Sequence, residues 1–489
     1  MIKTNLKALL LLCLVSTVMI SCGSNSNEVV LKYVTDKTLA VSRINLNELD
    51  GKLPKEEIAK DPKMQNMSDN EKEAFQLLMN GESAGINMDE PMYVMVDNVN
   101  NDMAVSIIMS LDDVKIFEQK FSKLTRKEVK VDTAKKTVYA GSELIGTLDD
   151  DVLILSKFTN YNNSYGENYQ ETDEKYYADF RARKATENES VQEQIKMALT
   201  EDTDMSLWVN LHGVINTASK GYIESLAVNK LLLNAALAVS VRFEKGEIVM
   251  ASQTHFNDEM RKVVEKYYEG KGVNYDMVKN IELDDTSGYG IGFFSMDLVR
   301  YMVKEAGLES AANNMLASQE LTLDDVMNAF TGDFAYANFK YFQNYSEDNM
   351  QYGVYPKQNM LLALGIDKTK GKKMMDFINT KMMPMIQSQG TVHMTNSMMV
   401  FATEPAKLEG IKKNKIANNT KLNKETGLNS ISWMDGSQIN EGLRYTNMRT
   451  NIKEIVSTAK VTDGAFTSEI KITLDKNKEN AIHYFMGYE

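Results

Sequence analysis

The chain has 489 residues, of which 43% are hydrophobic and 25% are charged, and this composition is typical of folded globular proteins. Acidic residues outnumber basic ones, giving a formal net charge of −13 at pH 7, which argues against nucleic acid and anionic lipid headgroups as partners. After residue 22, the sequence has no apolar stretch long enough to span a bilayer as a helix.

The amino terminus has the pattern of an export signal. Two lysines precede an apolar run over residues 8–20, which is too short to cross a membrane. The run ends in Met19-Ile20-Ser21-Cys22, which we interpret as a lipobox, because a lipoprotein needs a cysteine at the cleavage point to carry its lipid. We therefore expect a signal peptide over residues 1–21, lipidation of Cys22 and a lipidated tether over residues 22–36. The alternative is an ordinary signal peptide with an incidental cysteine.

The cysteine count agrees with this interpretation. The sequence has two cysteines, Cys13 and Cys22, and Cys13 would leave with the signal peptide. Cys22 would then be the only thiol of the mature chain, so an intramolecular disulfide is excluded. Thiol catalysis and a cysteine-based metal site are excluded for the mature body in the same way.

Four later segments follow one plan, in which a short apolar strand leads through a polar residue into a helix. The polar residues are Asn45, Asn210, Ser295 and Asp435. Such side chains can accept hydrogen bonds from the first free N–H groups of a helix, and Glu48 has the spacing of a capping-box partner. Both tryptophans of the chain, Trp208 and Trp433, stand two residues before the polar residue. The shared plan indicates an internal repeat.

Longer patterns repeat as well. A strand followed by an amphipathic helix, a tight strand pair and a longer hairpin each occur once early and once late in the chain. The ranges are 103–123 and 360–382, then 143–155 and 391–402, then 236–255 and 454–474. We therefore predict an α+β fold with two similar halves, residues 37–280 and 281–489, each with a largely antiparallel sheet and helices packed on one face. Residues 159–185 form a polar segment rich in Tyr and Asn within the first half.

Three short motifs resemble a known family. Residues 85–94 resemble the pattern G-I-D-x-x-x-P-V-Y-V, residues 323–334 a helix followed by L-T-G-D, and residues 36–46 the pattern P-x-D-A-x-x-V-x-x-I-D-L. Together they resemble large uncharacterised outer-membrane lipoproteins of Gram-negative gut anaerobes that share a domain of unknown function. The chain departs from the pattern because it lacks a proline near Asp36. The resemblance implies an outer-membrane lipoprotein with paired α+β halves, and it carries no catalytic residue with it.

Motifs of common catalytic chemistry are absent from the sequence. The four histidines have neither HExxH nor HxH spacing, and there is no GxSxG, phosphate-loop or dinucleotide-binding motif. The histidines are His212, His255, His393 and His483. Residues 288–292, Gly-Tyr-Gly-Ile-Gly, lie in a predicted strand, which we expect to be close-packed or bulged. We expect no catalytic residue, no metal site and no cofactor.

Two other features admit more than one explanation. Acidic clusters at residues 149–151, 202–204, 284–285 and 475–480 leave calcium as an alternative to solvated turns. The 32 methionines allow a copper site or a partner groove. They stand mostly at apolar strand and helix positions, which favours gap-filling in the core.

Two aromatic loops are the candidate ligand-binding segments. In the first, residues 339–357, aromatic rings stand among amide side chains, a combination that suits sugar rings. The rings are Phe342, Tyr345, Tyr352 and Tyr355. The matching connection of the first half is the short turn 97–102, and a loop extended in one copy is a candidate for acquired function. The second loop, residues 161–177, carries Tyr165, Tyr169 and Tyr176. The alternative is that the rings of both loops pack onto the body.

These features predict a lipid-anchored protein of the cell envelope, in the outer membrane and facing the periplasm or the cell surface. We expect a non-enzymatic protein that binds an envelope protein or a glycan, or that scaffolds other envelope components. One alternative is an envelope hydrolase acting on glycan or peptide, which would need a deep cleft with two carboxylates about 5–10 Å apart. The other is a purely structural component with neither such a cleft nor a surface rimmed by tyrosines.

Overall fold

The computed structural model describes residues 27–53, 84–99, 102–158, 169–200, 202–339, 359–386, 389–420, 422, 424–437, 439–440, 452–475 and 480–482. These residues form helices and antiparallel strands, which confirms the predicted α+β class. The chain divides into two compact units. Unit 1 comprises Met1–Gly221, Asn234–His255 and Lys476–Glu489, and unit 2 comprises Tyr222–Leu233 and Phe256–Asp475. None of the described helices is both long and apolar enough to cross a membrane.

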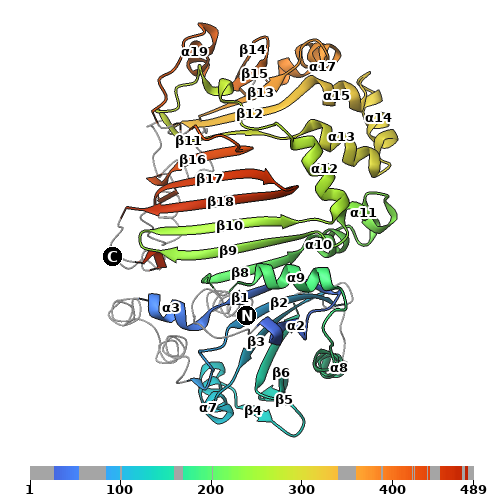
Figure 1. Cartoon of the computed structure of the whole chain (residues 1–489), viewed down its shortest axis with the longest axis vertical. Helices are drawn as coiled ribbons and strands as arrows, with labels where there is room; N and C mark the ends of the chain where they lie inside the picture. The colour runs from blue at the N-terminus through green and yellow to red at the C-terminus, as the bar shows by residue number, and fades with distance from the viewer. Residues whose placement is uncertain are drawn as a thin grey trace, which may run out of the picture. The chain divides into compact units, whose positions relative to one another are not determined.

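Unit 1 contains the antiparallel strands drawn in blue to green in Figure 1. They are β1 (Thr38–Ile44), β2 (Met92–Val99), β3 (Asp102–Ser110), β4 (Val129–Asp132), β5 (Thr137–Ala140), β6 (Glu143–Asp149), β7 (Val152–Phe158), β8 (Met205–Asn210), β9 (Ala236–Glu244) and β10 (Glu247–His255). Their pairing gives the order β4, β5, β6, β7, β3, β2, β1, β8, β9, β10. The hairpin predicted for residues 236–255 is confirmed as β9 and β10.

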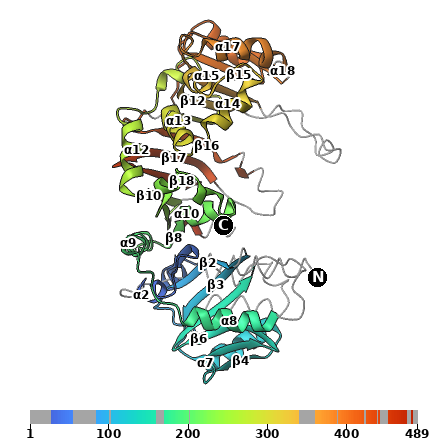
Figure 2. The same cartoon turned by 90° about the vertical axis from the view of Figure 1, so that its right-hand side faces the viewer.

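Helices α2 (Asn27–Leu31), α8 (Tyr169–Arg181) and α9 (Glu189–Ala198) of unit 1 share an apolar core with its strands. Further helices are α3 (Leu46–Lys52), α7 (Val114–Thr125) and α10 (Leu211–Ala218). Phe180 of α8, Ile195 of α9 and Trp208 of β8 are buried together in the core. Helix α8 lies against β6, as Figure 2 shows. Part of the polar segment predicted over residues 159–185 is therefore a packed helix.

The first described helix is anchored in this core. Val30 and Val34 are fully buried, and the hydroxyl of Tyr33 donates a hydrogen bond of 2.9 Å to the carboxylate of Asp149. The ammonium group of Lys32 lies 2.5 Å from the same carboxylate. Residues of α2 thus belong to the folded body, although they lie inside the range 22–36 that the sequence predicts as a tether.

Unit 2 has its own antiparallel strands and helices. The strands are β11 (Thr286–Phe293), β12 (Phe330–Phe339), β13 (Met360–Ile366), β14 (Thr391–Met394), β15 (Met398–Ala402), β16 (Ser430–Asp435), β17 (Ile452–Thr462) and β18 (Ala465–Leu474). Their pairing gives the order β14, β15, β13, β12, β11, β16, β17, β18. The α-helices are α11 (Asn229–Leu232), α12 (Asp258–Tyr268), α13 (Met296–Glu305), α14 (Glu309–Ala317), α15 (Leu323–Ala329), α17 (Lys372–Phe377), α18 (Met383–Ile386) and α19 (Glu409–Lys412).

The predicted capping residues behave differently from one another. Asn210 accepts a hydrogen bond from the Gly213 amide at 2.8 Å, and Ser295 accepts one from the Leu298 amide at 3.2 Å. Asn45 precedes α3 but makes no side-chain cap hydrogen bond, so the capping box predicted with Glu48 is wrong. The amide of the buried Asn45 side chain donates instead to the Thr203 carbonyl, and this tertiary bond replaces the local cap.

Candidate functional site

The residues that the sequence singles out for lipidation and ligand binding are not described. Cys22 and the rings of Phe342, Tyr345, Tyr352 and Tyr355 lie outside the described residues, so their roles stay predictions. Tyr176 of the second loop is described. It lies in α8, is 7% exposed and stands within hydrogen-bonding distance of the Ser106 hydroxyl at 3.1 Å. For Tyr176, the alternative that the ring packs onto the body is confirmed.

Glycines in two of the sequence motifs lie where neighbouring atoms leave no room for a side chain. One is in the glycine-rich run 288–292, and the other is in the family-like motif 323–334. Gly290 lies in β11, and a Cβ atom added there would stand 2.2 Å from the ring of Tyr336, which confirms the predicted close-packed strand. Gly332 has a φ of +93°, and an added Cβ would meet the Phe294 carbonyl oxygen at 2.2 Å. Both positions require glycine for close approach of neighbouring atoms.

The described acidic clusters bind groups of the protein itself. Burial raises the pKa of Asp149, but hydrogen bonds from Lys32 and Tyr33 outweigh it and hold the pKa below its usual value. Asp204 accepts hydrogen bonds from Lys52 and from the Phe243 amide. Among the described residues, no group of three or more His, Cys, Asp or Glu side chains is placed to hold a metal ion.

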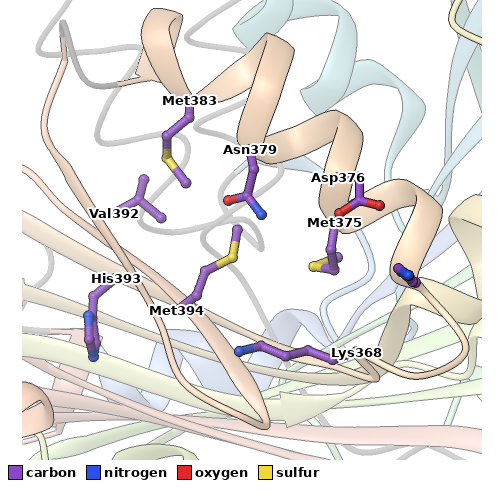
Figure 3. Close-up of a pocket in the computed structure, with 9 residues that line it drawn as sticks. Lys368, Met375, Asp376, Asn379, Met383, Val392, His393 and Met394 are labelled. Carbon is purple, nitrogen blue, oxygen red and sulfur yellow. The ribbon is translucent and has the colours of Figure 1, made fainter.

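The most distinctive surface feature is a groove of about 590 Å³ in unit 2. On one side lie α17, the π-helix η4 (Ile378–Met382) and α18, and on the other lies β14 (Figure 3). The lining residues are Lys368, Lys372, Met375, Asp376, Asn379, Met383, Val392, His393 and Met394. We call this feature the β14 groove.

The helix side of the β14 groove depends on the unusual backbone of η4. The Met383 amide donates to the Ile378 carbonyl five residues earlier, which is the bond of a π-helix, and such turns occur often at functional sites. Met375, Asn379 and Met383 follow one another at four-residue intervals along this helix, a spacing that places side chains on one face. All three line the groove.

The floor of the β14 groove is apolar and rich in methionine. Met375 is 5% exposed and belongs to a core cluster with Ala329, Ile366 and Ile378. Met383 and Met394 pack against that cluster. Figure 3 shows Val392 and Met394 directed toward the helix, whereas the His393 ring is directed away from it. The prediction that methionines fill the core is thus confirmed for Met375, and the same side chains also form a surface depression.

The rim of the β14 groove carries two lysines without ionic partners. Lys370 and Lys373, their neighbours, pair with Asp367 and Asp325. By contrast, neither Lys368 nor Lys372 pairs with a carboxylate among the described residues. The groove lining also includes the carboxylate of Asp376, so its two lysines leave a net positive charge. An apolar floor beside a net positive charge suits a ligand that is apolar on one side and anionic at one end.

A second hollow of unit 2, of about 1010 Å³, lies beside α12. Residues 269–275, residues 425–429 and the turn 463–464 complete its walls. Its rim mixes lysines such as Lys262 with carboxylates such as Glu265, so it has no single charge preference.

Among the described carboxyl groups, burial raises the pKa of Glu90 and Asp204, and both of these lie in unit 1.

The sequence did not single out the β14 groove, although it held a usable signal. In the first half, residues 126–142 separate α7 from β6 and contain β4 and β5. In the second half, only residues 387–390 separate α18 from β14. Comparing these two connections would have indicated a missing hairpin in the second half.

Comparison of the chain with protein-family models, with curated proteins and with solved structures gives no match.

Proposed function

We propose that this protein is a lipid-anchored, non-enzymatic component of the cell envelope, held in the outer membrane through Cys22, that binds a protein partner in the β14 groove. The observation that carries the proposal is the groove itself, with its methionine floor and two lysines that pair with no carboxylate in the described part of the chain. Methionine-rich surfaces adapt to protein side chains because the thioether chain is flexible and polarisable. The described lining residues include no Phe, Tyr or Trp, so a protein segment fits the groove better than a sugar ring does.

The position of α2 supports anchoring at short range. Val30 is the first of the described residues that is fully buried, and a chain extends at most about 3.6 Å per residue. Residues 23–29 therefore allow no more than about 30 Å between the lipid and the core of unit 1. Unit 1 would thus be held close to the membrane, which suits a scaffold or receptor role.

Strand order supports the two similar halves. In unit 1 the strands β6, β7, β3, β2, β1, β8, β9, β10 follow one another, and in unit 2 the strands β14, β15, β13, β12, β11, β16, β17, β18 do so. Each list takes the strands in the same relative chain order. We propose that the halves arose by duplication, with β4 and β5 present only in the first copy.

Photocrosslinking tests the proposed function. A crosslinking amino acid replaces Asn379 in the groove or, as a control, the exposed Lys413 in unit 2. Expressed in its own cells with Cys22 intact, the Asn379 variant should give a discrete adduct with an envelope protein that the Lys413 variant lacks. Identical products from both positions would contradict a binding role for the groove.

The aromatic loop remains a second candidate surface for the proposed binding function, since its four rings among amide side chains suit a glycan. Replacing Phe342, Tyr345, Tyr352 and Tyr355 with alanine should abolish retention of envelope glycans by the purified full chain. Unchanged retention would remove the loop from consideration. Hydrolysis of envelope glycan or peptide by the purified protein would instead favour the hydrolase alternative.

A further inference from the structure

We infer that the β14 groove binds an extended segment of a partner protein, which adds to the sheet as a strand paired with β14. Apolar side chains of that segment would rest on the methionine floor, and an acidic side chain would reach Lys368 and Lys372. This inference rests on the proposed function and specifies the form in which the partner binds.

One edge of β14 is not covered by any described strand. Among the described strands, β14 pairs with β15 on one side, and no strand pairs with its other side. The Thr395 amide donates to the Met398 carbonyl at 2.9 Å. Hydrogen-bonded and non-hydrogen-bonded residue pairs alternate along an antiparallel ladder. Because Thr395 forms a hydrogen-bonded pair with β15, His393 does so too, and Val392 and Met394 form the non-hydrogen-bonded pairs. The N–H and C=O groups of Val392 and Met394 therefore face outward, ready to pair with an added strand.

Side chains of β14 beside that edge point into the β14 groove. Val392 and Met394 extend from β14 toward the helix, into the groove (Figure 3). A strand added beside them would point every second side chain into the same space. Those side chains would meet Met375 and Met383. Main-chain bonds would then supply affinity, and the methionine floor would select apolar residues.

Unit 1 shows such an arrangement already filled by its own chain. Strand β6, the counterpart of β14, is paired along its outer side with β5, with Val138 opposite Gly146. Strand β4 continues the sheet and contacts α7, where the Val129 amide donates to Ser122 at 2.7 Å and the Val131 amide donates to Glu118 at 2.6 Å. Val129, Val131 and Val138 are all buried. In unit 2 the connection 387–390 is too short to supply a hairpin.

Charge and strand direction define the segment further. Strand β5 runs antiparallel to β6, so we expect the added strand to run antiparallel to β14. Lys368 follows β13, and the pairing of β13 and β14 with β15 puts the end of β13 level with Met394, on the other side of β15. The amino-terminal end of an antiparallel segment would lie there, so its acidic residue should precede its apolar residues. The two lysines also disfavour a copper ion among the three thioethers of the floor.

Peptide binding to the full mature protein in detergent tests the inference. The probe is a fluorescent hexapeptide with capped ends, Glu-Thr-Val-Thr-Val-Thr, which places its glutamate and both valines on one face of the strand, and its anisotropy reports binding. We expect saturable binding and at least about tenfold weaker binding of two controls. One control has lysine in place of the glutamate, and the other is N-methylated at alternate peptide bonds. Absence of binding up to about 1 mM, or equal binding of all three peptides, would overturn the inference.

Two variants locate the binding site. Val392→Pro removes an outward N–H while leaving the ladder to β15 intact, and it should weaken binding at least about tenfold. Val392→Thr keeps that N–H and serves as its control. The double variant Lys368→Met, Lys372→Met should weaken binding about three- to tenfold and abolish the preference for glutamate over lysine. Lys381→Met, on the same helix segment outside the groove lining, should change neither.

Three further results would distinguish strand addition by a partner from the alternatives. Binding that survives Val392→Pro in a variant with the wild-type circular dichroism spectrum would overturn strand addition. A wild-type dimer that Val392→Pro converts to a monomer would show that a second copy, and not a partner segment, occupies the edge. A specific adduct from the crosslinker at position 379 without any peptide binding would keep the proposed function and remove only this inference.

Discussion

The hydroxyl of Tyr33 lies 2.9 Å from a carboxylate oxygen of Asp149, and this contact joins the segment after α2 to the end of β6. Tyr33 is 1% exposed. Lys32 and Lys136 bind the same carboxylate, at 2.5 Å and 3.3 Å. Asp149 therefore gathers three donors and holds the first described residues of the chain against the sheet of unit 1.

Removing the tyrosine hydroxyl should weaken this junction. Tyr33→Phe keeps the ring in the core and deletes one hydrogen bond, so the free energy of unfolding of unit 1 should fall by about 1 kcal/mol. Urea denaturation, with hydrogen exchange of the α2 amides as a local probe, measures the change. Tyr222→Phe, at a tyrosine that is 61% exposed, is the control and should leave stability unaltered. Equal stability of wild type and Tyr33→Phe would mean that the contact contributes nothing.

The same junction should depend on pH. Lys32 and Tyr33 hold the pKa of Asp149 below its usual value despite burial. The carboxylate's stabilisation is therefore complete above the unfolded pKa and is lost as pH falls through the lower folded pKa. The stability difference between wild type and Asp149→Asn should shrink between about pH 5 and pH 2. Denaturation midpoints across that range measure it, and a constant difference would contradict the prediction.

Asp204 should respond with the opposite sign. Burial raises the pKa of Asp204 in spite of the hydrogen bond from Lys52, so the folded state binds a proton more readily than the unfolded state does. Protonation then favours folding. As pH falls through the folded pKa, wild type should gain stability relative to Asp204→Asn. The same series of denaturation midpoints provides the measurement, and a loss of relative stability would refute it.

A methyl group at Gly332 should be costly for two reasons. The backbone has a φ of +93° there, and the added Cβ would stand 2.2 Å from the Phe294 carbonyl oxygen. We expect Gly332→Ala to lower the free energy of unfolding by about 3 kcal/mol or more. Gly307→Ala is the matched control, because φ is +70° but no atom lies within 4 Å of the added Cβ. That variant should lose about 1 kcal/mol, and similar losses at both glycines would contradict the steric argument.

Replacing the proposed lipid-bearing sulfur tests the location. Cys22→Ser should abolish incorporation of labelled fatty acid, because a serine hydroxyl does not replace the acylated thiol. The variant should also leave the membrane fraction, because it would lack the proposed lipid anchor. Cys13→Ser, within the predicted signal peptide, is the control and should be acylated normally. Acylation of Cys22→Ser at wild-type level would refute the lipoprotein assignment.

Local sequence patterns predicted much of the architecture. The hairpin β9–β10 followed from two strand segments joined by the tight turn Lys245-Gly246, and α7 followed from the apolar face that includes Phe117. Asn210 and Ser295 cap their helices as their side-chain chemistry indicates. Asn45 does not, because its side chain is buried and bonded to Thr203, a residue far away in the sequence. Capping by short polar side chains is local chemistry, and it fails where a tertiary contact competes.

The sequence by itself determined the pattern of an export signal, the placing of both cysteines within or next to that pattern, and the α+β class, because each depends on residue order or on periodicity along one segment. Only the tertiary structure decided that Met375, Met383 and Met394 line a depression beside β14. The same apolar spacing serves a closed core and an open groove equally well. What distinguishes them is whether a neighbouring strand covers the edge, as β5 covers β6 and as no described strand covers β14.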